Sequence, residues 1–138
     1  MRLVIDTNIV VSALLKAGSV PAIVLRLATQ SHVIIKSIET EHEARATVQR
    51  PKLSSLIAPD AIHWLDTILA SAETVTIAER YQSCRDTKDN KFLNLAVNGR
   101  AEMIITGDAD LLVLGAFRDI PIIAPVTFLR AYYPGRLA

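Results

Sequence analysis

Several features that define common protein classes are scarce in this chain of 138 residues. The single cysteine, Cys84, cannot form an internal disulfide, so nothing indicates an oxidising compartment. There are only 5 glycines and 6 prolines, and 51% of the residues are hydrophobic against 21% charged. This composition is typical of a compact globular protein and excludes a disordered one. We expect one domain, residues 1–138, that buries roughly two thirds of the surface of its unfolded chain.

Long apolar runs are missing as well. No uncharged stretch approaches the ~20 residues that cross a bilayer. Only a few apolar residues separate Arg2 from Asp6, so we expect no signal peptide. These absences predict a soluble, cytoplasmic protein with no membrane partner. The net charge of +1 predicts no strongly basic surface for nucleic acid, although basic residues cluster locally.

The signatures of several enzyme classes are also missing. The stretch "DTNIVVS", which follows the first apolar segment, has no glycine, and this excludes a dinucleotide fingerprint and a phosphate-binding P-loop. The stretch "HEARA" at His42 lacks the second ligand of a zinc protease, because position 46 is alanine. One cysteine and three histidines form no zinc set.

Hydrophobic periodicity predicts strands that alternate with helices. The expected strands are residues 3–5, 32–36, 74–77, 103–106 and 120–123, and the expected helices are 20–28, 37–50, 61–68, 92–97 and 128–132. We expect Ser37 to cap its helix and Pro51 to end it. This alternation predicts an α/β fold, a three-layer α/β/α sandwich with a central, mainly parallel sheet.

Acidic residues are the remaining candidates for chemistry. Asp6 and Asp108 each follow a predicted strand, where sites form in such sheets. The other candidates are an acid on the 37–50 helix, Asp86 or Asp89, and Asp110. Oxygen ligands suit Mg²⁺ or Mn²⁺, and carboxylates that gather at one edge repel each other until a cation compensates them. Together the acids are typical of a metal site for phosphodiester hydrolysis.

Each acid also has a purely structural alternative, which stays open at this point. Asp86 and Asp89 are spaced as a cap and its partner for the 92–97 helix. Thr40 and Glu43 are spaced like a capping box, and Asp108 is placed to cap a short helix over 111–114. Caps at the start of the first helix are expected from the two residues that follow the first acid, Thr7 and Asn8.

Four motifs occur in a recognisable order: "VIDTNI", "EHEARATVQRPKL", "DTKDNKFLNLAV" and "IITGDADLL". They resemble the PIN-domain ribonucleases, most closely the VapC-like toxin components of bacterial toxin–antitoxin pairs. The resemblance extends from Leu3 to about Leu129. It implies a PIN-like fold and hydrolysis of phosphodiester bonds in single-stranded RNA with Mg²⁺ or Mn²⁺. The alternative is a catalytically silent module of the same fold that binds RNA or a protein.

The resemblance also implies roles for individual residues. The catalytic and metal-binding quartet is Asp6, Glu43, Asp89 and Asp108. The supporting polar residues are Asn8, Asp86, Thr106 and Asp110. Basic residues that lie near the acids in the sequence are candidate RNA contacts: Arg45, Arg85, Lys88 and Lys91. Glu39 lies one helical turn before Glu43 on the same face and remains the alternative helix acid.

The expected partners are an RNA substrate, a second copy in a homodimer and, for a toxin, a cognate antitoxin that blocks the site. A candidate partner surface comprises the helices over 20–28 and 61–68, whose apolar faces have core packing as their alternative use.

Overall fold

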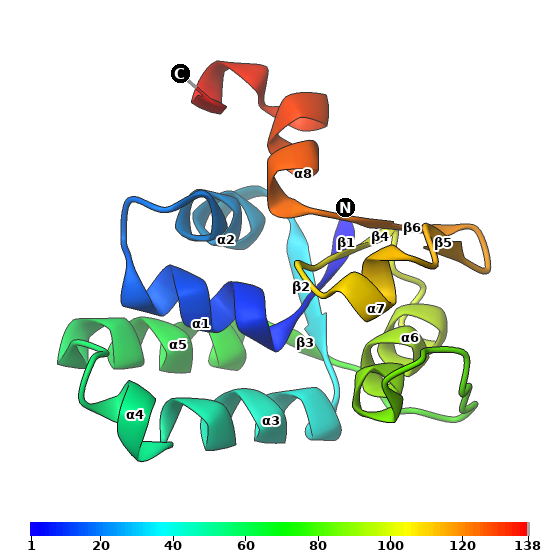
Figure 1. Ribbon diagram of the computed structural model, residues 1–138, viewed down its shortest axis with the longest axis horizontal. Helices are drawn as coiled ribbons and strands as arrows, with labels where there is room; N and C mark the ends of the chain where they lie inside the picture. The colour runs from blue at the N-terminus through cyan, green and yellow to red at the C-terminus, as the bar shows by residue number, and fades with distance from the viewer. Residues whose placement is uncertain (138) are drawn as a thin grey trace.

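The computed structural model describes residues 1–137 and shows a six-stranded sheet with helices on both faces (Figure 1). The strands are β1 (Arg2–Ile5), β2 (Val33–Lys36), β3 (Glu73–Thr74), β4 (Met103–Ile105), β5 (Ala116–Phe117) and β6 (Ile120–Ile123). The helices are α1 (Thr7–Leu15), α2 (Val20–Ser31), α3 (Ile38–Val48), α4 (Pro51–Ser54), α5 (Pro59–Ser71), α6 (Asn90–Asn98), α7 (Ala109–Leu112) and α8 (Pro125–Tyr132), with 3-10 turns η1 (Thr87–Asp89) and η2 (Pro134–Leu137). The predicted three-layer α/β fold is confirmed.

The order of the strands determines where a site forms. The order is β3-β2-β1-β4-β6-β5, and every neighbouring pair is parallel except β5 and β6. The chain therefore winds outward from β1 to β3, then returns to the other side of β1 and continues through β4 and β6. Ligands bind in such sheets where the winding reverses, at the carboxyl ends of the two central strands. Ile5 pairs with Ile105 across these strands, so the residues that follow both share one edge.

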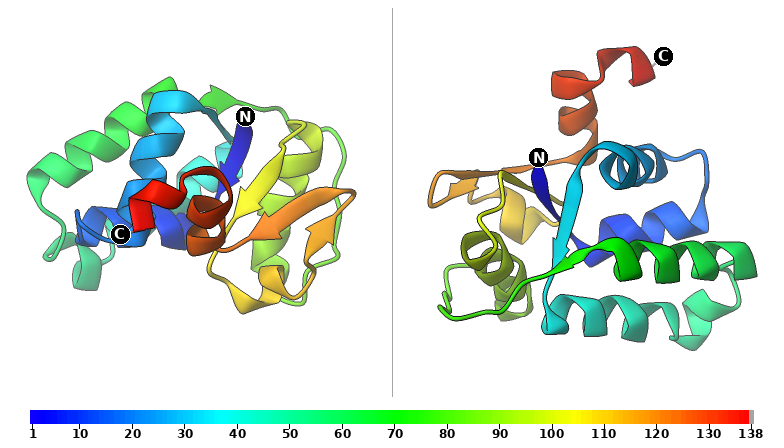
Figure 2. Two further views of the ribbon diagram at one scale, coloured as in Figure 1. Left: turned by 90° about the horizontal axis from the view of Figure 1, so that it is seen from above. Right: turned by 180° about the vertical axis from the view of Figure 1, so that it is seen from behind.

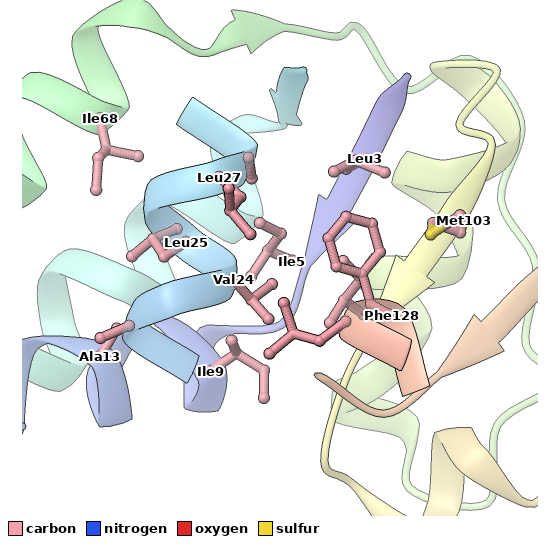
Figure 3. Close-up of a cluster of buried hydrophobic side chains, with 14 residues drawn as sticks. Leu3, Ile5, Ile9, Ala13, Val24, Leu25, Leu27, Ile68, Met103 and Phe128 are labelled. Carbon is pink, nitrogen blue, oxygen red and sulfur yellow. The ribbon is translucent and has the colours of Figure 1, made fainter. Parts of the chain in front are cut away.

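Alternate residues of the central strands bury both faces of the sheet. Leu3 and Ile5 pack in a cluster with α1, α2 and α8, which includes Leu25 and Phe128 (Figure 3). Val4 packs in a second cluster with α6 on the other face, and Figure 2 shows the sheet between these layers. Each fully buried side chain of this size contributes about 1.5–3 kcal/mol to folding. Packing on both sides anchors the strands that position the site.

The start of α3 is as predicted, with Ser37 as its cap, whereas its end differs from expectation. Ser37 accepts the Thr40 N–H at 3.2 Å, and Thr40 Oγ1 accepts the Ser37 N–H at 2.9 Å. This capping box excludes the alternative in which Thr40 pairs with Glu43. The helix ends at Val48, and Pro51 begins α4 rather than only ending α3. A proline is tolerated there because the first helical N–H needs no partner within the helix.

The helices expected to offer a partner surface use their apolar faces in the core. Val24 of α2 and Leu65 and Ile68 of α5 are buried. A groove of about 540 Å³ remains between α1, α2 and α5, with exposed Leu15 and Leu56 among its lining residues. Within residues 1–137 no single helix is long and apolar enough to cross a membrane; α1 and α2 pass that test only as a pair bent by 109°.

The close packing around Gly99, at the end of α6, can be tested by substitution. A Cβ at Gly99 would lie 2.5 Å from Ile35 Cδ1 and 2.9 Å from the Leu95 carbonyl oxygen. We expect Gly99→Ala to lower the free energy of unfolding by about 1–3 kcal/mol, because backbone as well as side chain must shift. Urea denaturation measures this. Gly18→Ala is the matched control, since nothing lies within 4 Å of its Cβ, and an equal loss in both variants would contradict the packing explanation.

Candidate functional site

Asp6 is the first residue beyond β1, and its N–H still donates to the Ile105 carbonyl of β4 at 3.0 Å. Its side chain caps α1, because Oδ1 accepts the Asn8 N–H at 3.2 Å. The other oxygen accepts the Thr106 hydroxyl at 2.6 Å, and the residue is only 2% exposed. The caps expected from Thr7 and Asn8 are therefore wrong: Asp6 is the cap, and Asn8 contributes its backbone N–H while the residue itself is exposed.

Thr106 connects Asp6 to Asp108 across the two central strands. Its hydroxyl donates to Asp6 and accepts the Asp108 N–H at 3.0 Å, and the residue is fully buried. Burial raises the pKa of Asp6, and the charges of Asp108 and Glu43 add to the effect, while the hydrogen bonds from Thr106 and Asn8 oppose it. The buried Thr106 hydroxyl is used both as a donor and as an acceptor, so its own orientation is fixed. The carboxylate of Asp6 that it contacts therefore has little freedom to rotate.

Three of the acids are each held by a local turn of the same kind. Asp6, Asp86 and Asp108 each precede a short helical segment and accept the N–H of the residue two positions further on. For Asp108 that donor is Asp110, at 2.7 Å. The predicted cap is confirmed, although the helix that it caps, α7, begins two residues earlier than the predicted 111–114 helix. Asp86 caps η1 rather than the predicted 92–97 helix. A cap occupies one lone pair, so each carboxylate keeps acceptor sites for a cation.

Asp89 is the carboxylate with the least compensation. The residue is 8% exposed, and within residues 1–137 its Oδ2 is buried with no hydrogen-bond partner. Burial raises the pKa of Asp89 to about 7, helped by the neighbouring Asp108 carboxyl group and by the charges of Asp6 and Asp86. A buried acceptor without a partner is costly, and a cation at this position would remove the cost.

The tightest group of acids is not the quartet that the motifs imply. Oxygens of Asp86, Asp89 and Asp110 all lie within 4.8 Å of one another, so two of the three belong to the supporting set. Asp110 also forms an ion pair with Arg85, N to O 2.8 Å, between partly exposed side chains. Asp89 belongs to both groups, since it also interacts with Asp108 and Asp6.

Among the helix acids, only some face the pocket. The charge of Glu43 acts on Asp6, and its carboxylate contacts the ammonium of Lys91. Glu39, the alternative, pairs with Arg80 between two exposed side chains, N to O 2.7 Å. The structure therefore brings Glu43 toward the other acids and leaves Glu39 at the surface.

Three of the four basic candidates lie beside the acids and one lies apart from them. Lys91 contacts Glu43, Arg85 contacts Asp110, and Lys88 is exposed beside them on η1. Arg45 lies apart, because its guanidinium pairs with Glu41 and with Asp66 of α5.

Sequence reasoning missed three asparagines of α6 that hold the loop in front of the site. Asn90 accepts the Cys84 N–H at 2.9 Å, Asn94 accepts the Tyr81 N–H at 2.5 Å, and Asn98 accepts two further loop amides at 2.9 Å. They recur every four residues, so they lie on one helical face. This spacing is visible in the sequence, and it fixes the segment that carries Arg85 and Asp86.

The donor set suits a hard divalent cation. The clustered side chains offer carboxylate oxygens, the ligands that Mg²⁺ and Mn²⁺ prefer, and the buried oxygen of Asp89 lacks a partner within the described residues.

The fold and this pocket define an α/β protein with an acidic site at the switch point of its sheet. The model of the PIN domain family matches residues 2–110, and the chain belongs to that family. The family resemblance of the four motifs is thereby confirmed.

Two similar proteins illustrate the relationship. The chain is 31% identical over 119 residues to the uncharacterized protein MJ1680 of Methanocaldococcus jannaschii, covering 83% of this chain and 75% of that protein. It shares its fold with a chain in the crystal structure of VapBC2 from Rickettsia felis bound to a DNA fragment from their promoter, with a TM-score of 0.63 at 17% identity. That similarity covers 90% of this chain and 98% of the other.

The raised pKa of Asp89 predicts how metal-free stability depends on pH. The folded state holds a proton up to a pKa of about 7, against 3.8 for an ordinary aspartate, so stability falls as pH rises across this interval. In EDTA, Asp89→Asn should remove this loss and be more stable than wild type above pH 7, by about 2–4 kcal/mol, with the difference vanishing toward pH 4. Denaturant unfolding across pH measures it. Asp66→Asn, on the surface, is the control; the same pH slope in wild type and Asp89→Asn would refute the assignment.

The asparagine series predicts a local effect on the loop. Asn94→Ala leaves the Tyr81 N–H without its acceptor and should lower the free energy of unfolding by about 1–3 kcal/mol. Amide hydrogen exchange should accelerate from Tyr81 to Asp86 and stay unchanged in β1. Gln82→Ala, an exposed change in the same loop, is the control. Uniform acceleration throughout the chain would show that the asparagine contributes only to global stability.

Proposed function

We propose that this chain is a Mg²⁺- or Mn²⁺-dependent ribonuclease that hydrolyses phosphodiester bonds in single-stranded RNA. Its main support is the buried, unpartnered oxygen of Asp89 among the charges of Asp6, Asp86 and Asp108. PIN domains are typically nucleases, so membership of the family supports the reaction class. A module that only binds has no need of mutually repelling carboxylates in a buried pocket.

We propose Asp6, Asp89 and Asp108 as the ligands of the ion, with Asp86 and Asp110 assisting through water. When bound, a divalent ion supplies positive charge that neutralises the carboxylates, promotes the ionisation of water and stabilises negative charge on a phosphate. Support for this set comes from the charge of Asp108, which raises the pKa of both Asp6 and Asp89, and from the oxygens of Asp86, Asp89 and Asp110, which lie within 4.8 Å of one another.

The side chains of the protein then have separate tasks in the hydrolysis. Thr106 holds the Asp6 carboxylate in one orientation. Glu43, on the α3 side of the pocket, orients the attacking water. The oxygen of this water bonds to phosphorus as the P–O bond to the leaving group breaks, and a proton passes to the leaving oxygen. Lys88 and Arg85 lie at the rim beside the acids and contact the flanking phosphates.

We further propose that the protein is the toxin of a toxin–antitoxin pair, acts in the cytoplasm as one folded domain and forms a homodimer. The shared fold with a chain of the VapBC2 complex supports a partner protein that covers the site.

The proposal predicts metal-dependent cleavage that fails when the pocket is altered. With Mn²⁺, the wild type should cleave a labelled single-stranded RNA faster than the matching DNA, and EDTA should stop it. Asp6→Asn should retain the fold and lose cleavage. Thr106→Val, which removes the hydroxyl that orients Asp6, should reduce the rate by about 10–100-fold.

Asp66→Asn is the matched control, because it removes an exposed carboxylate that pairs with Arg45 away from the pocket. Full activity in Asp6→Asn would refute the assignment of the site. RNA binding without cleavage, together with equal melting temperatures in Mn²⁺ and EDTA, would instead establish the silent binding module.

A further inference from the structure

One cation beside the acids comes from the protein itself, because it pairs with Glu43, whose charge acts on Asp6. Lys91, in the first turn of α6, places its ammonium against the Glu43 carboxylate of α3 and against the Lys88 carbonyl oxygen. The two side chains of this pair are only 16% and 30% exposed. The ammonium is therefore enclosed and held from two directions, unlike a mobile lysine at the surface.

The charges of the pocket are compensated unequally. On the α3 side Lys91 neutralises Glu43, and on the open side Arg85 neutralises Asp110. Among the ion pairs of residues 1–137, none involves Asp6, Asp89 or Asp108. The Oδ2 of Asp89 is buried and has no hydrogen-bond partner within residues 1–137. The uncompensated charge is thus concentrated on these three acids.

We propose that Lys91 takes the place of a second divalent cation at Glu43, so that the pocket binds a single ion, at Asp6, Asp89 and Asp108. This inference rests on the proposed metal-dependent function and specifies how many ions it uses. A second ion at Glu43 must displace an enclosed ammonium, or lie next to it and be repelled by its charge. Glu43 bound to Lys91 is a positioning group for the reaction, not a ligand.

The matched variants follow from the contacts of Lys91. Lys91→Met removes the charge and keeps the length of the side chain, whereas Lys91→Arg keeps the charge. Lys88→Met removes a neighbouring charge that is exposed. Circular dichroism and melting in EDTA check that each variant folds.

The experiment counts Mn²⁺ ions bound per chain, by calorimetric titration and by the electron paramagnetic resonance signal of free Mn²⁺. We expect one ion for wild type, Lys91→Arg and Lys88→Met, and two for Lys91→Met. Two ions in wild type would overturn the inference. One ion in Lys91→Met would also overturn it, whether the affinity is unchanged or tighter. Lys91 would then influence ion binding only through its positive charge and would not occupy the place of a second ion.

The same titration separates this inference from the proposed function. If wild type binds no Mn²⁺ at all, the metal-dependent function fails and the inference falls with it. If wild type binds two ions and cleaves RNA, the function stands and only the role of Lys91 is wrong.

Discussion

Repulsion between carboxylates held close together in a poorly solvated pocket is the constraint on which this site depends. Burial and the charges of neighbouring carboxylates raise the pKa of Asp6 and of Asp89, and the Asp89 oxygen buried among them finds no hydrogen-bond donor within residues 1–137. Such an arrangement persists only when a proton or a cation compensates the charge and when the rest of the fold supplies the stability. The clusters on the two faces of the sheet supply it here.

The protein tolerates this charge partly through its own local geometry. Three acids accept a backbone N–H at the start of a helical segment, and the Thr106 hydroxyl joins two of them across neighbouring strands. Each such bond stabilises a carboxylate in one orientation without occupying all of its acceptor sites. The acids are thus positioned before any ligand arrives, which is what a binding site for a metal ion requires.

Local signals in the sequence were sufficient for most of the elements. Short continuous apolar runs indicated the central strands, and Ser37 marked the start of α3 as a cap. The strand β5 and the hairpin that it forms with β6 were missed, because β5 has only two residues and the connecting turn has no glycine. Arg118 and Asp119 adopt positive φ there, which arginine rarely does, so no turn signal was visible.

Only some of the residues that form the site could be identified from such local signals in the sequence. The acids that follow β1 and β4 were identifiable because parallel strands end at a common edge. The choice between Glu39 and Glu43 was not, since both lie on the same helical face and one turn separates them. The pairing of Arg45 with Asp66 depends on how α3 packs against α5, far along the chain.

The sequence by itself determined the order along the chain of most strands and helices, the caps at Ser37 and Asp108, and the identity of the acids, because these follow from periodicity and from contacts between residues a few positions apart. Tertiary structure alone decided that Asp89 is the shared, uncompensated carboxylate, that Glu43 faces Asp6, and that Lys91 is enclosed beside Glu43. Those relationships depend on the rotation and separation of whole helices around the sheet. Long-range packing fixes both quantities, and no short stretch of sequence encodes them.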